Sequence, residues 1–180
     1  MSITTRLLLS LFFLFGSATF CASQSTGIDT LRLSKTVAIQ LQRLANAMMK
    51  GDYETLAKTT YPSLLAKAGG PAKAVAKIKA EMEEMLTEGI SFDSVYTGTP
   101  VSFVTAGPEI HTLIPQTILL TVKGRKLKSD SFMIGITSDK GNTWYFIDVS
   151  SNDEESIRQI LPHYNPALKI PARQPPTRIQ

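Results

Sequence analysis

The segment EIHTLIPQTILLTVKGRKLKSDSFMIGITSDKGNTWYFIDV, residues 109–149, decides the fold. It divides at two short polar stretches, KGRK at 123–126 and DKGN at 139–142, and each contains a glycine that can adopt a positive φ. In the segments that these stretches separate, β-branched and aromatic residues alternate with polar ones at the period of a strand. The segment therefore predicts an antiparallel meander of consecutive strands.

In the first strand of this meander the even-numbered positions form one almost wholly apolar face. They are Ile110, Thr112, Ile114, Gln116, Ile118, Leu120 and Val122. The odd-numbered positions are mixed, as is typical of a sheet face that is only partly covered. Pro115 cannot donate a backbone hydrogen bond, so we expect it at an edge or a bulge.

The strand at 143–149 is apolar on both faces apart from Asp148. We therefore expect this strand in the middle of the sheet, or covered on both sides.

The segment before the sheet is predicted to be helical. A first helix ends at Lys50, with Gly51 as its C-terminal glycine and Asp52 capping the next helix. Short helices follow at 53–58 and after Pro62, and a longer one runs over 71–88. Its predicted buried stripe consists of Val75, Ile78, Met82, Met85 and Leu86.

Two short strands, at 90–97 and 101–105, connect these helices to the meander. A capping-box pattern at 151–154 begins a last short helix. The fold class is α+β, with N-terminal helices packed on a curved antiparallel sheet.

The N-terminus has the pattern of a secretory signal peptide. Arg6 precedes the apolar run LLLSLFFLF, residues 7–15, and small residues follow. Nine residues are too short to span a bilayer, so an uncleaved anchor is the weaker alternative. We predict a signal peptide at 1–23, one α+β domain at 24–161, and a basic, proline-rich tail at 162–180. Apolar residues at 164–170 are expected to dock on the domain, and the tail from Pro171 is expected to be extended and mobile.

The only cysteine is Cys21, which lies close to the expected cleavage site of the signal peptide. Phe20 precedes it where a lipoprotein needs a small residue, so acylation is disfavoured. Cleavage beyond Cys21 leaves no thiol for a disulfide, a metal site or a nucleophile. The net charge of +4 is dispersed and has no base-stacking motif beside it, which argues against nucleic-acid binding. No histidine or carboxylate spacing resembles a zinc site, and neither a metal nor a cofactor is expected.

The order of elements resembles the cone-shaped α+β roll, cystatin-like in outline, of the nuclear transport factor 2-like superfamily. The residues that carry the resemblance are LANAMMKGDYETLAKTTYP at 44–62 and FMIGITSDKGNTWYFIDVS at 132–150. Small exported bacterial proteins with this fold and no assigned chemistry are also similar. One departure is that no strand is predicted between Tyr61 and Pro71, where many members have one.

The resemblance implies a pocket between the helices and the concave face of the sheet. Some relatives use this pocket for isomerase or dehydratase reactions, and many only bind or scaffold, so the fold does not choose among them. We expect Tyr53, Tyr61, Gln116 and Trp144 to line a ligand site, with core packing as the alternative for the aromatic residues.

Two residues are candidates for acid–base chemistry. Asp148 is a carboxylate on an apolar strand, and the alternative is a structural acid at a strand end. His111 is one of two histidines, and the alternative is a satisfied polar residue. An enzyme would need both residues to converge on one closed pocket.

No motif in the chain specifies a reaction. We expect a non-enzymatic, periplasmic or secreted domain that binds a small apolar ligand or a protein partner and dimerises through its sheet. No membrane span is expected after signal cleavage. One alternative is a cofactor-independent lyase or isomerase with Asp148 as general base and His111 or a tyrosine as proton donor. Another is an envelope assembly factor that uses its tail as a partner arm.

Overall fold

The computed structural model describes residues 27–149, 154–172 and 174–179. The predicted signal peptide, Cys21 and most of the capping box lie outside the described residues. The described elements, in chain order, are α1 (Thr30–Lys50), α2 (Tyr53–Thr59), α3 (Pro62–Lys67), α4 (Pro71–Thr87), β1 (Ile90–Thr97), β2 (Phe103–Ala106), β3 (Glu109–Val122), β4 (Arg125–Thr137), β5 (Tyr145–Asp148), α5 (Glu154–Ile160) and β6 (Thr177–Arg178).

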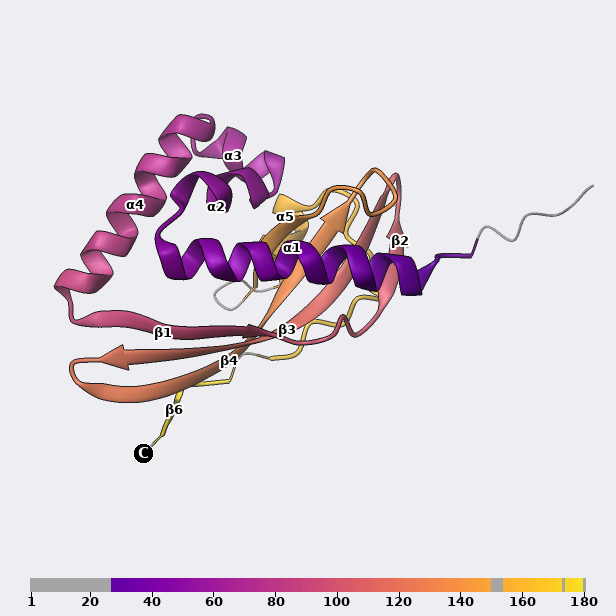
Figure 1. Cartoon of the computed structure of the whole chain (residues 1–180). Helices are drawn as coiled ribbons and strands as arrows, with labels where there is room; N and C mark the ends of the chain where they lie inside the picture. The colour runs from indigo at the N-terminus through magenta and orange to yellow at the C-terminus, as the bar shows by residue number, and fades with distance from the viewer. Residues whose placement is uncertain (1–26, 150–153, 173, 180) are drawn as a thin grey trace, which may run out of the picture.

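The sheet is antiparallel, in the order β1-β3-β4-β5, with β2 paired to β3 and β6 paired to β4. A two-residue turn joins β3 to β4, and both Lys123 and Gly124 have positive φ. Figure 1 shows α1 lying across the curled sheet while α4 runs from the helical layer towards the start of β1. The N-terminal helices therefore pack on a strongly curled antiparallel sheet, and the predicted cone-shaped α+β roll is confirmed.

The sheet carries a core on each face. On the concave face, Leu33, Val37 and Leu41 of α1 pack with Ile114, Met133, Trp144 and Phe146. On the outer face, Ile157, Leu161 and Leu168 follow the sheet in the chain and cover Leu113, Ile134, Ile136 and Ile147. The odd face of β3 is therefore better covered around Leu113 than its mixed composition predicts. β5 lies at the end of the strand order and is covered on both sides, the second of the two predicted possibilities.

Pro115 lies at a local edge of the pairing, as one of the two predicted possibilities has it, and not at a bulge of its own strand. On one side it stands opposite Phe132 of β4. On its other side β1 has ended at Thr97 and β2 begins at Phe103, so no ladder bond is required of its missing N–H. The Pro115 carbonyl oxygen accepts from the Gly98 N–H at 2.7 Å. The bulge of this region is instead in β1, between Phe92 and Ser94.

The boundary between the first two helices lies at the predicted capping residues. Gly51 ends α1 with φ of 67°, and the Asp52 side chain accepts from the Thr55 N–H at the start of α2. No strand forms between Tyr61 and Pro71, and only an isolated bridge joins Thr60 to Phe146. Within the described ranges, no helix is both long and apolar enough to cross a membrane.

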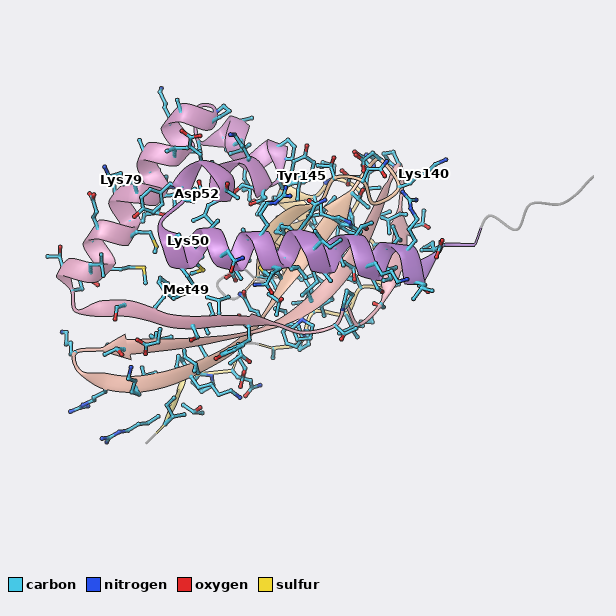
Figure 2. All side chains as sticks on the ribbon, in the orientation of Figure 1. Met49, Lys50, Asp52, Lys79, Lys140 and Tyr145 are labelled. Carbon is cyan, nitrogen blue, oxygen red and sulfur yellow. The ribbon has the colours of Figure 1, made fainter. Side chains whose placement is uncertain are left out.

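The predicted stripe of α4 is only half-buried, and its last member is exposed. Ala74 is the buried residue of this helix, whereas Leu86 is 62% exposed. At the border of this stripe, Lys79 pairs with Glu83 in solvent, and Figure 2 shows Lys79 pointing outwards. α4 is therefore held less closely against the sheet than its amphipathic pattern predicts.

The C-terminal segment docks on the domain as expected for residues 164–170. Tyr164 and Leu168 are buried in the outer core, and the Tyr164 hydroxyl donates to the Leu168 carbonyl oxygen at 2.6 Å. In the described part of the tail beyond Pro171, Thr177 and Arg178 pair with Lys128 and Leu127 of β4. This part is extended as predicted, but its pairing with the sheet differs from the predicted mobile tail.

Candidate functional site

A cavity of about 260 Å³ lies between α1, α2, α4 and the concave face of the sheet. Its position follows from the incomplete closure of α4 over the sheet. Most of its lining is apolar. These apolar residues are Leu44, Ala45, Met48, Leu56, Ile78, Met82, Val95, Ile118, Met133 and Phe146.

Simple periodicities place these side chains in the cavity. Leu44 and Met48 are one helical turn apart in α1, and so are Ile78 and Met82 in α4. Gln116 and Ile118 share one face of β3, because alternate residues of a strand point the same way. Large ligand pockets are usually apolar with few polar groups, and this cavity has that composition.

The polar side chains of the cavity gather at one end. Thr59 and Thr60 come from the end of α2, and Gln116 and Asp148 come from β3 and β5. The Gln116 Nε2 donates to the Asp148 Oδ2 at 3.0 Å. Gln116 is buried while Asp148 is exposed, so the amide holds the carboxylate where the cavity meets solvent. This arrangement orients a carboxylate at the polar end of the cavity.

His111 lies on the other face of the sheet. Its odd-numbered position in β3 turns it towards the outer core, whereas Asp148 shares the concave face with Met133 and Gln116. The two candidate acid–base residues are therefore separated by the sheet and do not converge on one pocket.

His111 belongs to a buried network with Tyr61 and Glu109. The Tyr61 hydroxyl donates to Glu109 Oε1 at 2.9 Å, and His111 Nε2 lies 3.0 Å from Glu109 Oε2. His111 is 0% exposed, and burial lowers its pKa below the ordinary 6.5. Burial and the hydrogen bond to Glu109 raise the pKa of Tyr61 to about 12. A neutral imidazole that donates from Nε2 to the carboxylate fits this geometry, and its buried Nδ1 has no hydrogen-bond partner within the described part of the chain.

Among the predicted ligand-binding residues, only Gln116 lines this cavity. Trp144 is buried in the concave core, where its Nε1–H donates to Thr36 Oγ1 at 3.1 Å. Tyr61 is engaged by Glu109 beside the outer core. Tyr53 lines a neighbouring hollow beneath the end of α1.

The sequence predicts Met82 in the buried stripe of a helix, and it places neither Met48 nor Met82 among the ligand-binding residues. The two methionines lie on facing helical stripes, and that placement was the available signal. Ile118 and Thr97 were likewise read only as strand positions, although their register brings them to the cavity. In the described ranges, no group of three or more histidine, cysteine or acidic residues is placed to hold a metal ion.

No protein-family model matches the chain, and no curated protein matches it. Among solved structures, the chain is similar to an LEH-like epoxide hydrolase from M. tuberculosis. The alignment covers 72% of this chain and 91% of that chain, with 12% sequence identity and a TM-score of 0.32.

Proposed function

We propose that the protein is an exported, non-enzymatic binding domain for one small, mainly apolar ligand. The observation that carries this proposal is the cavity of about 260 Å³ between α1, α2, α4 and the sheet, with apolar walls and polar groups confined to one end. Export is proposed from the signal-peptide pattern of residues 1–23. Burial of an apolar ligand against Met48, Met82 and Phe146 supplies the binding free energy.

The lyase or isomerase alternative has weaker support. A general base and a proton donor must both lie within hydrogen-bond reach of one substrate. Asp148 is at the cavity, but His111 is on the far side of the sheet and Tyr61 is held by Glu109. The assembly-factor alternative requires an apolar outer surface, whereas the outer face of the β3–β4 hairpin bears the pairs Lys126–Asp93 and Lys128–Asp130.

Binding of the neutral dye N-phenylnaphthylamine tests the proposal, with Ile118→Trp as the blocking variant. Ile118 points into the cavity, and its neighbour Leu119 has the opposite orientation in the same strand, so Leu119→Trp is a matched control. The wild-type protein and the Leu119→Trp variant are expected to bind one dye per chain. The Ile118→Trp variant should bind at least about tenfold more weakly, because the indole fills the site.

The measurement is dye fluorescence titration, with native mass spectrometry for stoichiometry and circular dichroism for folding. The proposal fails if a folded Ile118→Trp variant binds as tightly as the wild type. It also fails if the wild-type protein binds no dye. A dimer in the native mass spectrum without any ligand binding would favour the assembly-factor alternative.

A further inference from the structure

A second hollow, of about 290 Å³, adjoins the first and continues it. Met48 and Met82 line both hollows, so the two meet at these side chains. The same elements, α1, α4 and β1, contribute to both. Figure 2 shows methionine sulfur atoms in the space between these elements.

The second hollow is displaced from the first along α1, α4 and β1. From the first hollow to the second, the contacts move from Ile78 to Leu86 in α4 and from Thr97 to Ile90 in β1. In α1 they move from Leu44 to Lys50. Eight residues of helix rise about 12 Å. The combined space is therefore a long groove under α4, and an elongated ligand fits it better than a rounded one.

The two ends of the groove differ chemically. One end holds Asp148, oriented by Gln116. At the other end Met49 is 43% exposed and Leu86 is 62% exposed, and both line the second hollow. Figure 2 shows Met49 and Lys50 at this end of α1. Exposed apolar side chains around a groove are typical of a surface that is covered by a ligand.

We propose that the groove binds one unbranched amphiphile, with its alkyl chain under α4 and a hydrogen-bond-donating head, an ammonium or a hydroxyl group, at Asp148. This inference rests on the proposed binding function and specifies its ligand class. A carboxylate head is disfavoured because Asp148 repels it, and a donor head forms a charge-assisted hydrogen bond there. The methionine walls adapt to a flexible chain, because unbranched thioether side chains repack easily.

Charge alone does not produce this preference. The whole chain carries a formal net charge of +4, so non-specific attraction favours anionic ligands over ammonium compounds. Lys50 is exposed at the opposite, open end of the groove. A selective response to cationic heads therefore reports on Asp148.

The test is competition for the bound dye by dodecylamine, hexylamine, dodecanol and dodecanoate, each below its micelle concentration. Dodecylamine is expected to bind at least about tenfold more tightly than hexylamine, because each further buried methylene adds to the affinity. Dodecylamine should also bind at least about tenfold more tightly than dodecanoate.

Two variants test separately the binding of the ligand's alkyl chain and the binding of its head group. Met85 lines only the second hollow, so Met85→Trp should remove most of the advantage of dodecylamine while leaving hexylamine binding unchanged. Glu84→Trp, at an exposed neighbour, is the matched control. Asp148→Asn should weaken dodecylamine by about tenfold and dodecanol by less, since an asparagine carbonyl still accepts from a hydroxyl.

The outcomes distinguish this inference from the proposed function. If the dye binds the wild type and not Ile118→Trp, but chain length has no effect or dodecanoate binds best, the binding function stands and the amphiphile inference fails. If neither the dye nor any alkyl compound binds, both fail. An unchanged preference for amines in Asp148→Asn also overturns the assignment of the head.

Discussion

Glu109 organises the polar interior of the outer face, because its two carboxylate oxygens serve two different residues. One oxygen accepts from the Tyr61 hydroxyl, and the other lies against the buried His111 ring. The Tyr61 hydroxyl and both Glu109 oxygens thereby gain partners, as buried polar groups generally do. The network links the N-cap of α3 to β3, and it is better explained as structural support than as catalytic machinery.

The lowered pKa of His111 makes a prediction about pH. A histidine whose folded pKa is below its unfolded value of 6.5 binds protons less readily in the folded state. The free energy of unfolding should therefore fall as the pH drops below 6.5, because protonation favours the unfolded chain. Urea unfolding of the wild type and of His111→Gln between about pH 7 and pH 5 measures this effect, and the variant should lose less stability over this window.

The matched control is His163→Gln, because His163 is exposed and contributes the smallest of the causes that set the pKa of His111. It should follow the wild-type pH dependence closely. An identical pH slope in the wild type and in His111→Gln would show that His111 does not contribute.

The alternation of residues along β3 predicted the face of Ile114 and Ile118, but not the partners of the polar residues. His111 and Gln116 have opposite parity, so their separation by the sheet follows from the sequence. The register of β5 against β4 decides whether Asp148 lies on the face of His111 or on that of Gln116, and Asp148 pairs with Met133. Register is set by long-range pairing and turn geometry, which single residues do not reveal.

At the scale of elements, β4 pairs with β3, β5 and β6. Within β4, Gly135 is closely surrounded by side chains of the neighbouring strands. Gly135 lies between Thr112 of β3 and Phe146 of β5. A Cβ at this position would lie 3.0 Å from Ile114 Cδ1 and 3.1 Å from Thr112 Cγ2. Glycine therefore allows the side chains of Ile114 and Thr112 in β3 and Phe146 in β5 to pack closely over β4 here.

Gly135→Ala should destabilise the protein by about 1–3 kcal/mol, because an added methyl group overpacks a closed core. This outcome reverses the usual gain from replacing glycine, which reduces the entropy of the unfolded chain. Chemical denaturation measures the change. Ser129→Ala, in a half-buried part of the same strand, should have a smaller effect, and equal stabilities for the two variants would contradict the packing argument.

The elements themselves were largely predictable, because glycine and proline mark their ends. Gly51, Pro62, Pro71 and Gly124 each stand at a boundary of the folded chain. The coverage of an element was not predictable in the same way. The stripe of α4 identifies which side faces inwards, but the half-burial of Met82 and Met85 depends on how the curled sheet positions β1.

At the scale of the whole molecule, the sheet separates two regions with different properties. The outer side is filled by α5 and residues 161–168, while the concave side is filled near the start of α1 and open beneath α4. The closed outer core supports the sheet from behind, and the cavity lies on its concave side, as expected when a site is placed on stable elements. The resemblance to cone-shaped proteins predicted this pocket in outline, and only the structure identified the residues that line it.

Two truncations test how far the domain extends. Removing residues 171–180 should leave a folded protein with nearly unchanged stability, because β6 contributes only two exposed residues to the sheet. Removing residues 162–180 takes away Tyr164 and Leu168 from the outer core, and it should abolish cooperative unfolding or lower the melting temperature sharply. Thermal unfolding followed by circular dichroism compares them. Equal melting temperatures would place the domain end at Leu161.

The position of the outer core near the end of the chain has a consequence for the order of events during synthesis. Leu113, Ile134 and Ile147 emerge from the ribosome well before Ile157, Leu161 and Leu168, which cover them. Until then the outer face of the sheet is an exposed apolar surface that cannot yet be closed. The outer core can therefore be completed only after Leu168 has been synthesised, and a shorter nascent chain leaves this face of the sheet uncovered.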